Sequence, residues 1–265
     1  QALRIVYSGA TTGWIPILDK TVADVPAAPG NQNGIFGYGY VITFSSLTNL
    51  VSSAGVVASD TTGVGTARYY LPATQYGGDK GIFAYGGTGS FVSLTNLVTN
   101  VGVVGSDVTG VGTARRALQS CEYGDDKGIF GYGYVSGYVS LTNLVTNVGV
   151  VGSDVTGVGT ARQQNAACSY GGDKGIFGYG STSVANVSNL VSNVGVVASD
   201  VTGVGTQREQ LAACEYAGDK GIFGFGYNGS SNVSMTNLVT NVGVCGTDVT
   251  GVGTGRLGLG ACSYN

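Results

Sequence analysis

The chain has 265 residues, of which 48 are glycine and only 4 are proline, and its net charge is −3. Glycine without proline, in a chain with 43% hydrophobic residues, argues against a disordered or collagen-like protein and indicates short strands joined by tight turns. The chain has no Lys/Arg cluster, which argues against nucleic acid as a ligand because that affinity comes from neutralising phosphates. Its apolar runs are only strand-sized, so we expect no membrane insertion.

Residues 1–30 do not repeat and are predicted to form a separate element. Leu3–Tyr7 and Gly13–Leu18 are typical of the two strands of a β-hairpin, with Trp14 near its turn. Thr21–Gly30 contains two prolines and is predicted to be a linker. We expect residues 1–30 to serve docking or assembly, through self-association or contact with other structural subunits.

Residues 31–265 are built from five copies of one block. Gly-Ile-Phe recurs with spacings of 47, 47, 47 and 46 residues, at Gly34, Gly81, Gly128, Gly175 and Gly221. An arginine follows Gly-x-Gly-Thr-x in every copy, at Arg68, Arg115, Arg162, Arg208 and Arg256. Val92–Arg115 is identical to Val139–Arg162 over 24 residues. So regular a period indicates one supersecondary unit that is copied and stacked.

Each copy is predicted to contain four short strands. In the third full copy these are Arg162–Tyr170, Gly175–Gly180, Val187–Val194 and a fourth within Val196–Arg208. Gly171–Lys174 is a turn signal between the first two strands. No helical period of 3.6 is present. Four strands in about 47 residues are typical of a β-propeller blade, so we expect an all-β, five-bladed β-propeller.

The phase of the repeat indicates how the ring closes. The first copy lacks its opening strand, and Asn31–Gly34 leads directly into the second. The last copy supplies an extra opening strand, Arg256–Tyr264. If that strand pairs beside Gly34–Gly39, five complete blades close without an open edge. Alternatively, it completes the first blade of a neighbouring chain and builds a filament.

The repeat resembles the blades of kelch proteins. In kelch repeats an arginine opens the innermost strand and the second strand ends in glycines, as Arg162 and the glycines of Lys174–Gly180 do here. The double glycine of kelch repeats is Gly-Tyr-Gly in this chain, and the tryptophan of the fourth strand is missing. The block Asn143–Arg162 resembles repeats of tailed-phage and environmental virion-associated proteins, and the N-terminal hairpin is similar to small modules of phage structural proteins. The kelch-like resemblance covers about residues 31–265, and the phage-like match is specific as a block but does not name a function.

The residue types present argue against catalysis. The chain has no histidine, which removes the commonest general base and the commonest metal ligand. No Ser-His-Asp or Cys-His arrangement can form, and copper sites like those of kelch-fold oxidases need histidines. We therefore expect no enzyme activity, no catalytic residues, no metal site and no cofactor.

An aspartate occupies one position of every copy, eight residues before the repeat arginine, at Asp60, Asp107, Asp154, Asp200 and Asp248. These could be five equivalent cation sites or structural Asp–Arg contacts, and the fivefold repetition favours the structural interpretation. Second-strand aromatics at Phe36, Phe83, Phe130, Phe177 and Phe223 are predicted to pack between blades. Four cysteines share another position, Cys121, Cys168, Cys214 and Cys262, and are predicted to be small buried residues, which suits assembly in a reducing cytoplasm.

Two variable regions are the candidate ligand-binding surface. The copies differ at the two residues after each arginine and in the loop after the second strand, namely Tyr40–Phe44, Gly87–Phe91, Tyr134–Tyr138, Ser181–Ala185 and Tyr227–Ser231. Loops at the ends of a propeller carry binding, and aromatic and amide side chains suit sugars. The candidate residues are Tyr69, Tyr70, Arg116, Gln163, Gln164, Glu209, Tyr134, Tyr138 and Tyr227. Neutral drift in exposed loops would give the same variation.

Three sequons, at Asn186, Asn228 and Asn232, are candidate glycosylation sites, although chance matches are expected in a chain rich in Asn, Ser and Thr. Together these features predict a non-catalytic structural or adhesion protein of a virion or extracellular surface fibre, with host glycans as candidate ligands. The alternatives are a soluble lectin-like module and a filament subunit.

Overall fold

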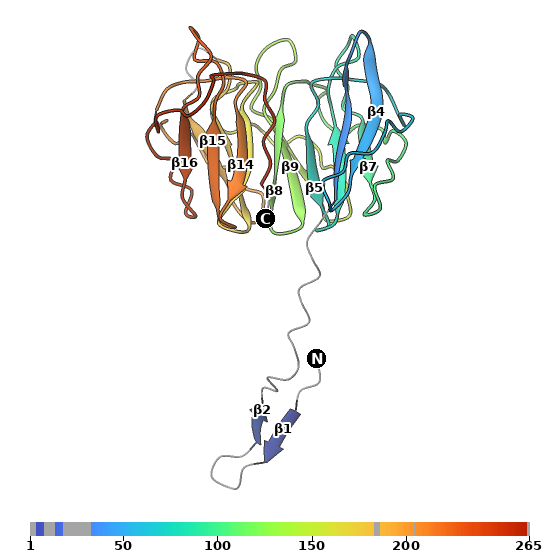
Figure 1. Cartoon of the computed structure of the whole chain (residues 1–265), viewed down its shortest axis with the longest axis vertical. Helices are drawn as coiled ribbons and strands as arrows, with labels where there is room; N and C mark the ends of the chain where they lie inside the picture. Colours follow the sequence, from blue (N-terminus) through green and yellow to red (C-terminus); the bar gives the residue numbers. More distant parts are fainter. Residues whose placement is uncertain (1–3, 8–13, 18–32, 183–185, 204, 264–265) are drawn as a thin grey trace.

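The computed structural model describes residues 4–7, 14–17, 33–182, 186–203 and 205–263. Within these residues the protein is all-β: it contains sixteen strands in small antiparallel sheets and no helix (Figure 1). The predicted all-β class is therefore confirmed.

The N-terminal strands form a sheet of their own. β1 (Arg4–Tyr7) pairs antiparallel with β2 (Trp14–Ile17), and Arg4 lies opposite Ile17. The predicted hairpin strands are present, one residue shorter at the ends, and neither pairs with any other described strand. The predicted linker, Thr21–Gly30, lies outside the described residues.

Four copies of the repeat each form a three-stranded antiparallel sheet in which the second strand is central. Their strands are β5 (Ala73–Tyr76), β6 (Lys80–Ala84) and β7 (Thr95–Val98); β8 (Gln119–Tyr123), β9 (Lys127–Gly131) and β10 (Thr142–Val145); β11 (Ala166–Tyr170), β12 (Lys174–Gly178) and β13 (Ser188–Val191); β14 (Ala212–Tyr216), β15 (Lys220–Gly224) and β16 (Thr236–Val239). The first strands β5, β8, β11 and β14 contact one another in sequence, so the sheets stand side by side in chain order (Figure 1).

In the copy that opens at Arg162, the first three strands are shorter than predicted: β13 spans Ser188–Val191 within the predicted Val187–Val194, and left-handed residues limit the first two strands. The prediction for β12 ran to Gly180, but Tyr179 has φ 60° and Gly180 has φ 116°, and both leave the extended conformation. The first strand was predicted from Arg162 and begins only at Ala166, since Gln164 has φ 52°.

The predicted fourth strand is reduced to two isolated bridges, Ser188 to Val201 and Val191 to Val197. Between these bridges the Asn189 side chain donates to the Ala198 carbonyl and to Asp200. A side chain therefore satisfies a carbonyl that a regular ladder would have paired with backbone.

The first copy forms only a two-stranded sheet, β3 (Gly34–Tyr40) and β4 (Phe44–Val51), with a bulge between Gly37 and Gly39. Residues 256–263 form no strand, and among the described residues β3 pairs only with β4. The predicted closing pair is thus not formed in this structure. Residues 256–258 are instead bonded to the last sheet, since Gly226 N donates to the Arg256 carbonyl.

The core lies between neighbouring sheets. At each of four junctions a tyrosine of one sheet meets a phenylalanine of the next at 5.1–5.6 Å between ring centroids, in the pairs Tyr38–Phe83, Tyr85–Phe130, Tyr132–Phe177 and Tyr179–Phe223. Phe130, Phe177 and Phe223 are fully buried, as predicted for packing between blades, whereas Phe36 of the first sheet is 64% exposed.

Candidate functional site

The repeat arginine is the centre of a buried polar network. Arg115 Nη2 donates to Asn143 Oδ1 at 2.7 Å, and its Nε donates to the Tyr132 carbonyl at 2.8 Å. Its Nη1 lies 3.8 Å from Asp154 Oδ1. Asp154 in turn accepts from the backbone and hydroxyl of Thr113 at 2.9 and 2.6 Å. Arg68, Arg115, Arg162 and Arg208 are all fully buried.

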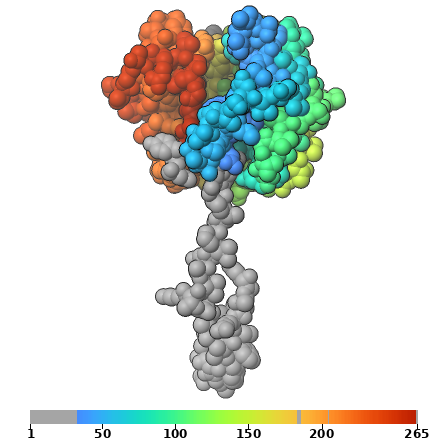
Figure 2. All heavy atoms as spheres, turned by 45° about the vertical axis from the view of Figure 1, so that its right-hand side comes forward, coloured from blue at the N-terminus to red at the C-terminus, as the bar shows by residue number. Residues whose placement is uncertain are grey.

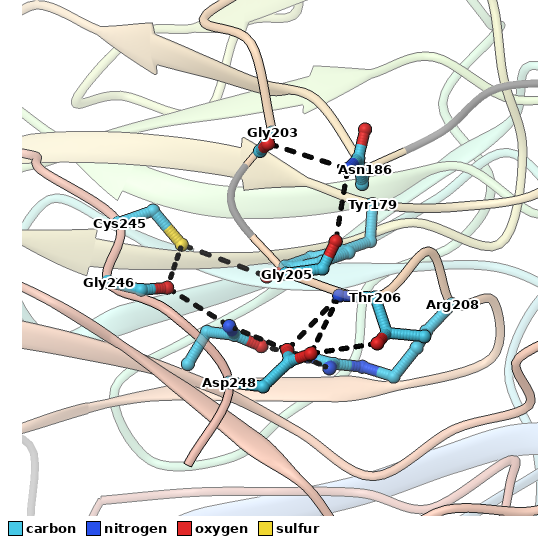
Figure 3. A network of polar contacts seen from close by, with 10 residues as sticks. Tyr179, Asn186, Gly203, Gly205, Thr206, Arg208, Cys245, Gly246 and Asp248 are labelled. Carbon is cyan, nitrogen blue, oxygen red and sulfur yellow. Dashed lines mark hydrogen bonds and ion pairs between the residues drawn. The ribbon is translucent and has the colours of Figure 1, made fainter.

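Figure 3 shows the same arrangement in the last sheet, where Thr206 and Arg208 point toward the carboxylate of Asp248. Each described contact joins the aspartate to the arginine and threonine at the start of its own repeat, about 40 residues earlier in the chain. Asp200 is bound by Thr160 and Asn189. No such contact is described for Asp60 or for Arg256.

Each buried arginine also lies over an aromatic ring of the preceding sheet, which adds cation–π attraction. Arg115 lies 4.4 Å from the centroid of Tyr85, and Arg162 lies 3.7 Å from that of Tyr132. Burial raises the pKa of both tyrosines to about 12, although the arginines oppose the change. The network therefore joins one sheet to the next.

The aspartates stay ionised in this network. Burial raises the pKa of Asp154, but hydrogen bonds from Thr113 and Asn143 outweigh it, and the net pKa lies below the ordinary value. Burial lowers the pKa of Arg115, against the attraction of Tyr85 and Asp154. An ionised acid whose oxygens are already occupied by Thr, Asn and Arg has little capacity left for a cation.

The variable positions of the first three sheets converge on one surface. A bridge between Tyr69 and Gly87, and another between Gly87 and Phe91, set the second sheet's variable regions side by side. In the third sheet, Arg116 bridges Tyr134, which bridges Tyr138. Together these regions form what we call the aromatic cluster: Tyr40, Phe44, Tyr69, Tyr70, Phe91, Arg116, Tyr134 and Tyr138.

Arg116 holds the aromatic cluster together. Its Nη1 donates to the Tyr69 hydroxyl at 2.9 Å, and its guanidinium lies 5.2 Å from the Phe91 centroid and 5.8 Å from those of Tyr70 and Tyr134. Tyr69 stacks on Phe44 at 5.1 Å. No acidic side chain pairs with Arg116 in the part of the chain that the structure describes, so its charge is available to a ligand.

Much of the aromatic cluster faces solvent. Tyr40 is 63% exposed, Tyr70 53% and Tyr138 43%, while Tyr69, Phe91, Arg116 and Tyr134 are half-buried. Exposed rings beside an unpaired guanidinium offer flat apolar faces together with hydrogen-bond donors.

Five of the nine predicted ligand residues thus lie together: Tyr69, Tyr70, Arg116, Tyr134 and Tyr138. Gln163 bridges Ser181, and Glu209 bridges Tyr227, in sheets with no described contact to the aromatic cluster. Gln164 contributes backbone hydrogen bonds to the neighbouring repeats. Tyr40, Phe44 and Phe91 were not predicted individually, although they stand at the ends of the variable loops that the sequence marks.

The cysteines differ among themselves. Cys121 and Cys168 are buried as predicted, and burial raises the pKa of Cys121 to about 12. Cys214 is half-buried and Cys262 is exposed, which the prediction of small buried residues missed. The exposure follows from the unpaired state of residues 256–263.

The sequon asparagines have different surroundings. Asn186 donates to the carbonyls of Gly203 and Gly205, whereas Asn228 accepts from the backbone of its own loop. Asn232 is exposed and bridges Tyr227.

An open groove of about 740 Å³ lies between the first two sheets. It is lined by Gly34 and Ile35 of β3, by Leu50, by Gly81 and Ile82 of β6, and by Glu122. Burial, and next the charge of Glu215, raise the pKa of Glu122 to about 7.

The described residues contain no group of three or more His, Cys, Asp or Glu side chains that could hold a metal ion. They include no helix long and apolar enough to cross a membrane. Neither the models of known protein families nor the curated proteins compared with this chain give a match.

Proposed function

We propose that residues 31–265 form a five-bladed, kelch-like β-propeller. A chain of backbone hydrogen bonds supports this arrangement: Ala117 donates to Tyr70, Gln164 to Ala117, Gln210 to Gln164 and Gly258 to Gln210. One residue from each repeat takes part, always the second after the arginine. A bond from Tyr70 N to the Gly258 carbonyl would complete a ring of five.

The propeller is a non-catalytic adhesion module that binds carbohydrate through the aromatic cluster. The observation that carries this function is the convergence of variable aromatic residues from three sheets around Arg116. Aromatic faces stack on the apolar faces of sugar rings, and a guanidinium without an acidic partner binds hydroxyl pairs or the carboxylate of an acidic sugar. In the four interior junctions the repeat arginine and aspartate are occupied with one another and with neighbouring repeat residues.

A glycan array tests this function with the full chain, with Arg116→Ala and with Tyr70→Ala. We expect wild-type binding to a subset of glycans, with acidic sugars among them, and at least a tenfold loss in both variants. Gln163→Ala is the matched control, because it changes a variable position outside the aromatic cluster. Binding that survives in both cluster variants but falls in the control would contradict the assignment.

The setting that we propose is a virion or an extracellular surface fibre, with residues 1–30 as the connector. The support is that β1 and β2 pair only with each other among the described strands, as a separate docking element would. Electron microscopy of the chain with and without residues 1–30 tests this role. Multimers that need residues 1–30 are expected, whereas discrete single propellers in both samples would favour a soluble lectin-like module.

A further inference from the structure

The interior junctions between sheets repeat one set of contacts, two of them at all four junctions and the third at the three junctions that follow the second sheet. Besides the tyrosine–phenylalanine pair, a leucine of one sheet covers a glycine of the next: a Cβ placed on Gly102 would lie 2.5 Å from Leu50, and one on Gly149 would lie 2.9 Å from Leu97. A third contact sets a first-strand side chain on the Gly of the next Gly-Ile-Phe. A Cβ on Gly175 would lie 2.5 Å from Cys121 Sγ.

The first sheet has the residues that would receive each of these contacts, but their partners from a preceding sheet are missing among the described residues. Phe36 is 64% exposed and meets no tyrosine ring among the described residues. A Cβ on Gly55 would meet nothing within 4 Å, and one on Gly34 would meet only Val51. Asn49 donates to Asp60, as in every repeat, but no described arginine or threonine contacts this pair.

The last sheet has the residues that would make each of these contacts, but their partners from a following sheet are missing among the described residues. Leu238 is 42% exposed, and Phe225 contacts Arg256 but no phenylalanine among the described residues. Arg256 is exposed, and within the described part of the chain its side chain donates only to the Thr254 carbonyl. A Cβ on Gly253 would meet nothing within 4 Å, whereas its counterpart Gly205 lies against an aspartate and an asparagine.

These unmatched residues are complementary. Phe225 of the last sheet has no phenylalanine partner, and Phe36 of the first sheet would supply one. Leu238 has no glycine to cover, and Gly55 has no leucine over it. Thr254 and Arg256 are the donors that Asp60 and Asn49 lack. By analogy with the interior junctions, the Cys214 side chain would pack against Gly34.

The groove between the first two sheets is the place of the missing strand. In the interior sheets the first-strand cysteine lies opposite the isoleucine of Gly-Ile-Phe, as Cys121 lies opposite Ile129. The same register sets Cys262 opposite Ile35 and against Gly81, and both of those residues line the groove. Among the described residues, a Cβ on Gly81 would meet nothing from the first sheet.

We propose that the chain's own residues 254–263 latch the ring, with Thr254 and Arg256 bound to Asp60 and Asn49 and with Cys262 in the groove beside β3. The latch rests on the five-bladed arrangement proposed above. It forms within one chain because residues 256–258 are already held by Gly226 and Gln210. Figure 2 shows the red C-terminal repeat and the blue first repeat on adjoining parts of the surface.

The position of Cys262 supports closure in cis. Burial, and next the neighbouring Cys262 thiol, raise the pKa of Cys214. The pKa of Cys168 is likewise raised by burial and next by the neighbouring thiols of Cys121 and Cys214. Residues 256–263 therefore follow the last sheet as each interior first strand follows the one before it.

Two single substitutions test the latch with native thiols. Gly34→Cys sets a thiol against Cys214, and Gly81→Cys sets one against Cys262. After diamide oxidation, which removes two electrons and two protons from each thiol pair, we expect intrachain disulfides in at least half of the molecules. Non-reducing gels and peptide mapping measure them. Gly137→Cys, in a loop where a Cβ would meet nothing within 4 Å, and the wild-type chain are the controls.

Interchain disulfides at the same positions would replace the latch with strand exchange between copies, and absence of both disulfides in folded protein would overturn it. A double-mutant cycle with Asp60→Asn and Arg256→Gln covers the case in which a cysteine variant fails to fold. Each single change should lower Tm by about 2–4 °C, and the double variant should fall no further than the worse single one. Additive losses would refute the contact. Glycan binding by the same variants reports separately on the proposed function.

Discussion

Arg115 and Arg116 are neighbours in the chain and belong to different regions of the molecule. Arg115 is fully buried and is tied to Asn143 and Asp154, in a network that recurs from sheet to sheet. Arg116 is half-buried, pairs with no described acid and lies among aromatic rings at positions where the repeats differ in sequence. The repeated network holds sheets together, while the aromatic cluster breaks the repeat symmetry, as a binding surface is expected to.

The largest effect should come from breaking the network. We expect Arg115→Ala to lower the free energy of unfolding by about 3–5 kcal/mol, because Asn143 and the Tyr132 carbonyl lose their buried partner. Denaturant unfolding measures the loss. Arg116→Ala is the matched control and should lose less than about 1 kcal/mol. Equal losses in the two variants would erase the distinction between the regions.

The next largest effect should come from replacing Asn165 with the leucine that other repeats have at the same position. Asn165 is buried, and its side-chain nitrogen and oxygen have no described partner, whereas the second, third and fifth sheets have leucine at this position. Asn165→Leu should therefore raise the free energy of unfolding by about 1–3 kcal/mol. Thermal unfolding measures the gain, and Leu118→Asn should give the reverse change in the neighbouring sheet. A loss of stability in Asn165→Leu would indicate a polar role for Asn165.

Acid should weaken the network. The pKa values of Asp107, Asp154, Asp200 and Asp248 lie below the ordinary value, because hydrogen bonds outweigh burial. Their contribution is therefore fully present above about pH 4 and is lost as the pH falls through the lower folded-state values. Tm should fall as the pH drops below about 4, and less steeply in Asp154→Asn. An equally steep fall in that variant would remove Asp154 from the explanation.

The smallest effect on stability should come from the exposed rings. We expect Tyr70→Ala to change the free energy of unfolding by less than about 0.5 kcal/mol, because more than half of its side chain already faces solvent. The same variant should lose glycan binding, which sharpens the contrast with the network. A large loss of stability would instead place Tyr70 among the folding residues.

The sequence by itself determined the period, the all-β class and the hairpin strands, because alternation, turn residues and exact copies are local signals. It also marked the two variable regions, since differences between copies can be read without a structure. It did not predict where strands end, because Tyr179 and Gln164 take left-handed conformations that only their packing between sheets selects.

Only the tertiary structure decided which residues meet. Each aspartate stands eight residues before one arginine, yet the described contacts join it to the arginine at the start of its own repeat, because the strands fold back on each other. Tyr40, Tyr70 and Tyr138 come from three repeats, and stacking of the sheets brings them to one surface. Contacts between distant segments depend on that stacking, and no local pattern in the chain encodes it.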